Sequence, residues 1–173
     1  DQKICGLVAK ENLAVGDVQY ENRWYGAWAP DRKEMFTSPE GSQIPIGRLL
    51  FQASGLGRFG IEICEDSWKG LRPGSTYALH GARIMLNPSA SWFVLGKHRV
   101  RRDMVSQVSR EDKVVYLYSS LLGCDSTRLI FDGSVFIAHG GDILKEGRRF
   151  LFKESMDMVD GVVDLDALGQ SRM

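Results

Sequence analysis

The order of apolar segments between residues 82 and 120 constrains the fold more than any other feature of this sequence. Residues 82–87 (ARIMLN) form a short apolar run typical of a buried strand, and residues 114–120 (VVYLYSS) form another. Between them, over residues 97–112, apolar side chains recur on one helical face: Val100, Met104, Val105 and Val108. Polar side chains take the other faces: Arg99, Arg101, Arg102, Gln107 and Arg110. We therefore expect an amphipathic helix packed on a sheet.

Shorter signals extend this sheet. Residues 48–52 and 58–64 flank the turn SGLG and predict a hairpin, and the Gly-Gly-Asp turn within residues 134–147 predicts a second one. A proline near the start and a glycine at the end predict a short helix over residues 73–81. Further strands are predicted over residues 3–9, 148–153 and 158–166, and residues 10–30 are typical of a structured loop. The fold class is therefore α/β, with α+β layering: a mixed sheet with helices outside.

Composition narrows the class of protein. The 173 residues are 43% hydrophobic, and 22 basic residues balance 22 acidic ones, which is typical of one globular domain and argues against nucleic acid or an anionic membrane as partner. No apolar stretch approaches the roughly 20 residues that cross a bilayer, and the first residues lack the apolar core of a signal peptide. We expect a cytoplasmic protein that acts on a small molecule.

The cysteines and histidines do not form a metal site by spacing. Three cysteines at irregular intervals fit neither a disulfide framework nor a zinc ribbon, and no pair of histidines has ligand spacing. We expect no metal.

Cys64 and Lys10 each follow an apolar, strand-like run. A cysteine in such a position is most often a small core residue, and a lysine is most often a solvated strand end. Together, however, a thiol and an ammonium on neighbouring strand ends can perform acyl transfer, because the cation favours the thiolate and can stabilise an oxyanion. Both interpretations remain open from the residues alone.

Several motifs in one order carry a resemblance to a known family. They are a lysine after a strand, Glu-x-Arg with an aromatic after it, Ile-Cys-Glu-Asp-x-Trp, Asn-x-Ser-Ala-Ser and Phe-Asp-Gly. In these motifs the chain resembles the nitrilase-type carbon-nitrogen hydrolase family, and most of all the glutaminase domains of glutamine-dependent NAD synthetases. The resemblance runs nearly from end to end. It implies a nitrilase-like α-β-β-α sandwich, of which residues 1–173 are the C-terminal part.

The resemblance also implies residue roles. Cys64 matches the nucleophile, Lys10 the lysine that stabilises the tetrahedral intermediate, and Glu21 a second, supporting glutamate. The residues that would hold the substrate glutamine are Glu65, Trp68, Ser91 and Lys97. Trp68 also fits a side chain that merely covers the pocket floor, and Lys97 fits a solvated charge at the start of a helix.

Polar residues after the predicted strand 82–87 have a second interpretation. Asn87, Ser89 and Ser91 fit turn and capping residues as well as a binding role. The segment GCDSTRLIFDG, with Asp125, Arg128 and Asp132, fits a polar loop that braces the pocket or meets a partner subunit, and it fits plain surface salt bridges equally well.

The family's general-base glutamate precedes every motif found here, so we expect it upstream of residue 1 and expect residues 1–173 alone to be slow or inactive. No phosphate-binding glycine loop occurs. The resemblance implies that ATP, magnesium and a nicotinic acid dinucleotide bind a separate synthetase domain, that ammonia is passed to it, and that the protein is a homo-oligomer. Two rival functions are a stand-alone amidase or nitrilase for another small amide or nitrile, and an inactive domain kept as an interaction scaffold.

Overall fold

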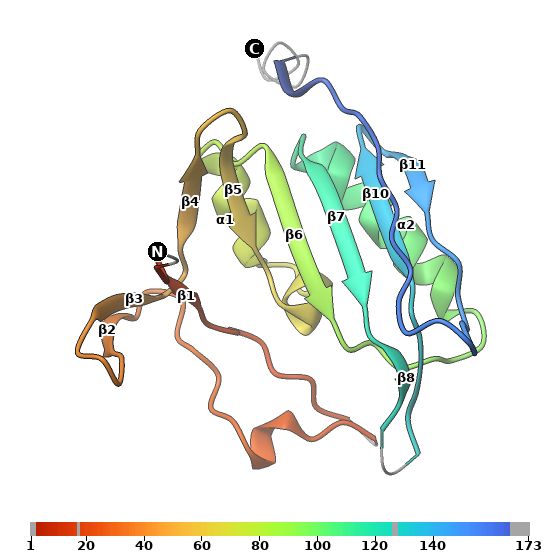
Figure 1. Cartoon of the computed structure of the whole chain (residues 1–173), viewed down its shortest axis with the longest axis horizontal. Coiled ribbons are helices and arrows are strands. Elements are labelled where there is room, and N and C mark those ends of the chain that lie inside the picture. Colours follow the sequence, from red (N-terminus) through yellow and green to blue (C-terminus); the bar gives the residue numbers. More distant parts are fainter. Residues whose placement is uncertain (1–2, 17, 126–127, 167–173) are drawn as a thin grey trace.

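A six-stranded mixed sheet forms the centre of the computed structural model, which describes residues 3–16, 18–125 and 128–166 (Figure 1). The strand order is β11-β10-β7-β6-β5-β4. The three central strands β5, β6 and β7 are parallel, and the outer pairings are antiparallel. The strands are β4 (Leu50–Ala53), β5 (Gly57–Ile61), β6 (Ile84–Ser89), β7 (Val115–Ser120), β10 (Val135–His139) and β11 (Asp142–Glu146). Both predicted hairpins and the predicted mixed sheet are confirmed.

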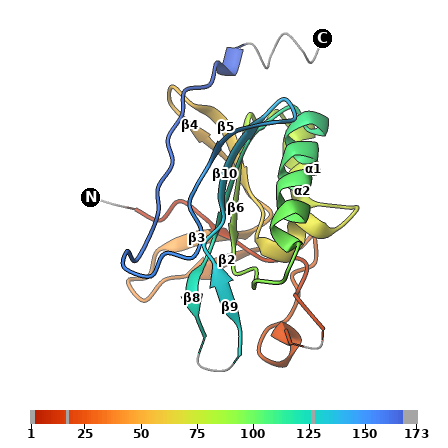
Figure 2. The same ribbon diagram turned by 90° about the vertical axis from the view of Figure 1, so that its right-hand side faces the viewer.

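Two helices cover one face of this sheet (Figure 2). α1 (Pro73–Leu79) connects β5 to β6 and α2 (Lys97–Glu111) connects β6 to β7, because parallel neighbours need a crossover between them. Side chains from the sheet and the helices form the main core, and the largest fully buried apolar ones are Tyr116, Tyr118, Phe136 and Met85. None of the described helices is both long and apolar enough to cross a membrane.

α2 confirms the predicted helix but corrects the predicted apolar face. Val105 and Val108 are buried as expected, whereas Val100 is 52% exposed and Arg101 is fully buried. The reason is a buried acidic partner, Asp132, which draws Arg101 to the protein side of the helix and leaves Val100 in solvent.

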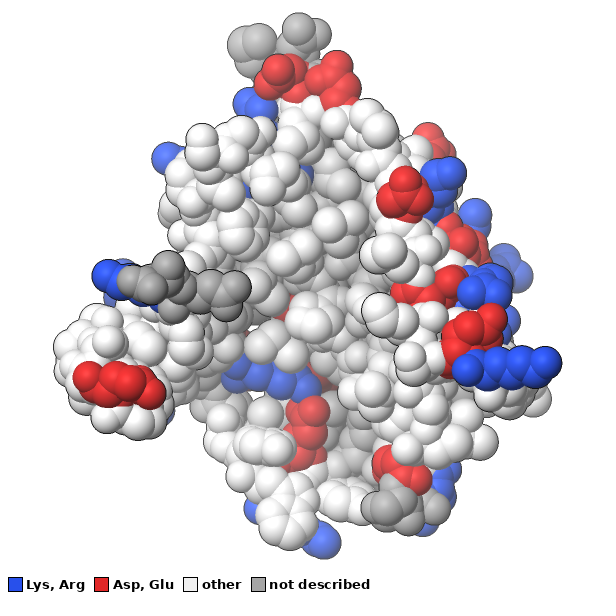
Figure 3. Space-filling view, viewed as in Figure 1, with Lys and Arg blue, Asp and Glu red and all other residues white. Residues whose placement is uncertain are grey.

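The opposite face of the sheet is partly covered by the C-terminal segment, which Figure 1 shows crossing in front of the strands. Val159, Val163 and Leu165 pack there against Ile137 and Val115. Figure 3 shows that charged side chains lie mostly toward the edges of this face. The strands predicted over residues 148–153 and 158–166 are wrong, because neither backbone joins a ladder, although the side chains of Val159, Val163 and Leu165 reach the sheet.

Smaller elements surround the central sheet. The strand predicted over residues 3–9 is only β1 (Leu7–Val8), which pairs with a hairpin that the sequence analysis missed, β2 (Lys33–Thr37) and β3 (Gln43–Gly47). A second missed hairpin is β8 (Leu122–Cys124) and β9 (Ile130–Asp132). Two 3-10 helices, Glu21–Arg23 and Cys64–Trp68, complete the described structure, the first within the predicted loop 10–30.

The parallel strands bring candidate active-site residues to one edge of the sheet. Cys64 follows β5 and Ser91 follows β6, and the carboxyl ends of parallel strands meet at one edge of a sheet. Open sheets of this kind bind ligands at that edge.

Candidate active site

Cys64 lies on a strained turn just beyond β5. It begins the 3-10 helix with φ of 50°, in the left-handed region that residues with a Cβ rarely adopt. Its side chain is nearly buried, its carbonyl accepts a hydrogen bond from the Ser67 hydroxyl at 2.8 Å, and the backbone nitrogen of Ile63 donates to Asp66 at 3.0 Å. Strain held by several hydrogen bonds is typical of functional turns.

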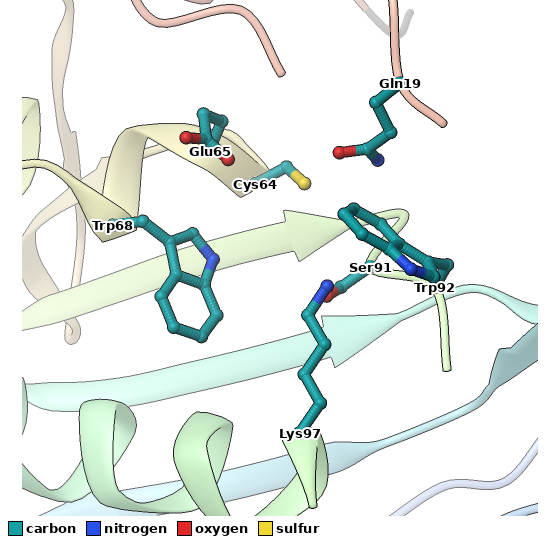
Figure 4. Close-up of a pocket in the computed structure, with 7 residues that line it drawn as sticks. All are labelled: Gln19, Cys64, Glu65, Trp68, Ser91, Trp92 and Lys97. Atoms are coloured by element: carbon teal, nitrogen blue, oxygen red, sulfur yellow. The ribbon is translucent and has the colours of Figure 1, made fainter. Parts of the chain in front are cut away.

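The Cys64 thiol opens into a pocket of about 260 Å³ (Figure 4). Its lining side chains come from two loops, the 3-10 helix and the start of α2: Gln19, Cys64, Glu65, Trp68, Ser91, Trp92 and Lys97. The structure therefore brings together the predicted nucleophile and all four predicted substrate-binding residues. Sequence reasoning missed Trp92, which directly follows the Asn-x-Ser-Ala-Ser motif, and Gln19, for which no local signal exists.

Lys97 is the cation of this pocket. Figure 4 shows its amino group reaching toward Ser91, and its Nζ lies 3.3 Å from the centre of the Trp92 ring system. Burial, aided by the charge of Arg101, lowers the pKa of Lys97 to about 8, although Cys64 and Glu65 favour its charged form. Glu65 forms an ion pair with Lys69 at 2.7 Å.

Lys10 and Glu21 form an ion pair with each other. The Glu21 carboxylate also accepts a hydrogen bond from the backbone nitrogen of Ala14 at 2.7 Å, and the Lys10 carbonyl accepts one from Trp28 at 3.0 Å. The pair lines a second pocket of about 300 Å³, with aromatic walls from Tyr25 and Trp28. The structure thus places Lys10 and Glu21 together, but not in the lining of the Cys64 pocket.

Glu62, two residues before Cys64, is held in the core. It is fully buried, accepts hydrogen bonds from Tyr116 at 2.6 Å and from the Gly74 backbone at 3.0 Å, and pairs with Arg72 at 3.0 Å. These partners occupy its carboxylate oxygens, so Glu62 is unsuited to take a proton from the thiol.

Asn87 and Ser89 interact mainly with each other. The Ser89 hydroxyl donates to Asn87 Oδ1 at 2.6 Å, and neither residue lines the Cys64 pocket. Both residues lie within β6 and pair with β7, so they are strand residues rather than the expected turn or capping residues, whereas Ser91 lines the pocket.

Asp132 does not line the Cys64 pocket but binds Arg101, and it is fully buried, which rules out the surface salt bridge. Burial alone would raise the pKa of Asp132, but the charges of Arg101 and Arg149 hold it below its usual range. Among the described residues, no group of three histidine, cysteine or acidic side chains could hold a metal ion.

Known structures share the fold described above. The chain is 37% identical to a glutamine-dependent NAD(+) synthetase from Cytophaga hutchinsonii over 86% of its length, with a TM-score of 0.76. It also superposes, over 94% of its length, on 53% of a carbon-nitrogen hydrolase from Helicobacter pylori G27 with a TM-score of 0.71, at 16% identity. The chain has the nitrilase-superfamily fold.

Sequence similarity to curated proteins extends over nearly the whole chain. A glutamine-dependent NAD(+) synthetase from Oryza sativa subsp. indica is 30% identical over 99% of it. The chain spans about a quarter of such relatives, 24% of the rice enzyme and 23% of the Cytophaga one. No family model matches the chain.

Proposed function

We propose that this chain hydrolyses the side-chain amide of glutamine to glutamate and ammonia, through a thioester on Cys64. The observation that carries the proposal is the pocket itself, in which a thiol on a strained turn shares one cavity with a cation, Lys97, and an anion, Glu65. Glutamine offers matching groups, because its α-carbon bears both a carboxylate and an ammonium.

The pocket supports one orientation of the substrate. Lys97 pairs with the α-carboxylate, Glu65 with the α-ammonium, and the Ser91 hydroxyl hydrogen-bonds the same end of the molecule. Trp68 covers the aliphatic part of the side chain. The amide carbon then faces the Cys64 sulfur.

The reaction follows in two halves. The thiolate attacks the amide carbon to give a tetrahedral oxyanion, whose stabilisation the family resemblance assigns to Lys10. The carbon–nitrogen bond then breaks as the leaving nitrogen takes up the proton that the thiol lost, and ammonia departs. Water then cleaves the thioester, which releases glutamate and restores the thiol. Glu21 keeps Lys10 charged and oriented through their ion pair. The general base that takes the thiol proton and later activates the water is a glutamate that the family resemblance places before residue 1.

The proposal extends to a longer protein. Residues 1–173 are then part of a glutaminase domain, and a linked synthetase domain binds ATP, magnesium and a nicotinic acid dinucleotide and uses the ammonia to make NAD. The support is that the similar rice and Cytophaga proteins are glutamine-dependent NAD(+) synthetases about four times as long as this chain. We further propose that this longer protein is cytoplasmic and forms a homo-oligomer.

The test is Cys64→Ala in the natural full-length protein. We expect glutamine-dependent NAD formation to fall to background while ammonia-dependent formation is retained, because only the first needs the thiol. Cys124→Ala, at an exposed thiol, is the matched control and should change neither activity. Equal loss of both activities in Cys64→Ala, or retention of both, would contradict the proposal.

A further inference from the structure

Arg101 is a charged residue in the second turn of α2 that the proposed reaction does not use. It is fully buried, and so is its partner Asp132. The Nη1 atom of Arg101 donates to the two Asp132 carboxylate oxygens at 2.7 and 2.9 Å and to the Ser134 hydroxyl at 3.0 Å. Buried charges cost free energy unless such bonds compensate them, so this arrangement needs an explanation beyond packing.

The other edge of the guanidinium faces the candidate active site. Nη2 of Arg101 donates to the carbonyls of Ser91 and Trp92, both at 2.8 Å, and Nε donates to the Ser91 hydroxyl at 3.2 Å. Both residues line the Cys64 pocket. One planar group therefore binds two consecutive carbonyls through Nη2 while Nη1 binds Asp132 and Ser134, a set of contacts that the single ammonium of a lysine cannot make at once.

The acidic partner of Arg101 is itself held in place. Arg149 donates to Asp132 at 3.1 Å, and the Asp132 carbonyl accepts a hydrogen bond from the Phe150 backbone at 2.9 Å. The position of the guanidinium, and with it that of the two carbonyls, is consequently defined by β9 and the segment after β11.

Arg101 influences the pocket through Trp92 and Lys97. The Trp92 ring packs on the Lys97 amino group, so a shift of the Trp92 backbone displaces the partner of the pocket's cation. The Cys64 turn has separate supports, which include the hydrogen bonds from Asn12 to Asp66. Substitution of Arg101 should therefore disturb the substrate-binding side of the pocket more than it disturbs the Cys64 thiol.

We infer that Arg101 is a positioning residue that holds the segment of Ser91 and Trp92 against the pocket and thereby sets the affinity for glutamine. The inference rests on the proposed function for its substrate. It assigns Arg101 no contact with glutamine and no part in the chemical steps.

The test compares Arg101→Lys with Arg102→Lys in the natural full-length protein. Lysine keeps a positive charge, but its single ammonium cannot bind the Asp132 carboxylate and both carbonyls at once. Arg102, in contrast, is half exposed and pairs with Glu146. We expect Arg101→Lys to raise KM for glutamine by about tenfold or more, the scale of a lost hydrogen bond from a charged donor, with kcat changed by less than about threefold. Arg102→Lys should leave both constants unchanged.

Two readouts separate positioning from general destabilisation. In Arg101→Lys, hydrogen exchange should accelerate in the segment 90–96 while α1 keeps its protection, and alkylation of Cys64 by iodoacetamide should stay within about twofold of the wild-type rate. If Arg101→Lys does not fold, Asp132→Asn must produce the same rise in KM.

The inference is overturned if KM is unchanged, or if protection is lost throughout the protein together with kcat. If the wild-type protein does not hydrolyse glutamine, the proposed function fails instead. The exchange comparison then still decides whether Arg101 holds the segment, since unchanged exchange in 90–96 would contradict it.

Discussion

Asn12 donates two hydrogen bonds to one carboxylate oxygen of Asp66, from its backbone nitrogen at 2.7 Å and from its side-chain amide at 2.9 Å. Asn12 stands two residues after Lys10, and Asp66 stands two residues after Cys64. The contact therefore ties the segment of the proposed oxyanion-stabilising lysine to the turn of the proposed nucleophile, although the two side chains line different pockets.

Removing this tie should destabilise the turn. Asp66→Ala leaves the partly buried backbone nitrogens of Asn12 and Ile63 without their acceptor, which we expect to lower the free energy of unfolding by about 1–3 kcal/mol. Denaturant unfolding measures the change. Asp103→Ala, at an exposed position on α2, is the control and should cost less than about 0.5 kcal/mol. Equal stability of the two variants would mean that Asp66 does not fasten the turn.

Glu62 should be required for stability rather than for catalysis. Glu62→Ala leaves Arg72 paired with Asp112 but removes the acceptor of the Tyr116 hydroxyl and the Gly74 nitrogen, and we expect the free energy of unfolding to fall by about 3–5 kcal/mol. Glu34→Ala, at a largely exposed ion pair, should cost no more than about 1 kcal/mol in the same unfolding experiment. A Glu62→Ala protein as stable as wild type would show that the buried pair contributes nothing.

Gly74 should tolerate no side chain. An alanine Cβ there would meet the Glu62 carboxylate and lie 3.1 Å from the Arg72 guanidinium. Glycine-to-alanine substitutions in helices usually stabilise by about 0.5–1 kcal/mol, but here we expect a lower melting temperature. Gly70→Ala, where the added Cβ has open space, is the matched control. A melting temperature raised by Gly74→Ala would contradict the packing described here.

Lys97 should give glutamine hydrolysis an alkaline limit. Its pKa is lowered to about 8, so the charged form that pairs with the α-carboxylate is present below that pH and is lost above it. We expect KM for glutamine to rise as the pH passes about 8, with kcat affected less. Steady-state kinetics across this range measure the effect.

Lys97→Arg is the informative control, because an arginine stays charged at every pH of the assay. Its KM should lose the rise near pH 8. The same rise in both proteins would assign the titration to another group. The effect of Lys97 on folding stability has the opposite pH dependence, because the folded protein holds the Lys97 proton less tightly than the unfolded chain does. Lys97 therefore lowers the free energy of unfolding at pH values below its shifted pKa of about 8, and this penalty disappears above the ordinary pKa of lysine.

The sequence analysis identified most of the helix-covered sheet, because α2 and the apolar runs on either side of it follow regular periods. Periodicity could not show which polar residue of α2 would be buried, since the partner of Arg101 is 31 positions away in β9. Residues 158–166 show the opposite limit. Their alternation correctly indicates side chains that face the sheet, yet backbone pairing depends on neighbours that alternation does not specify.

The candidate site was predictable to a similar extent. Five of the predicted residues line one pocket because their motifs follow β5, β6 and the start of α2. The strained backbone of Cys64, the placement of Gln19 and the separate pocket of Lys10 and Glu21 depend on tertiary contacts that no local pattern carries.

Cys64 is proposed to be the activated thiol of a glutamine site. Peptide mapping after reaction with an electrophilic glutamine analogue, with and without excess glutamine, tests this most directly. Cys5 and Cys124 are internal controls, because both are exposed while Cys64 is buried. The account predicts a single adduct on Cys64 that glutamine prevents. Labelling of Cys5 or Cys124 at the same rate, or an adduct on Cys64 that glutamine does not prevent, would contradict it.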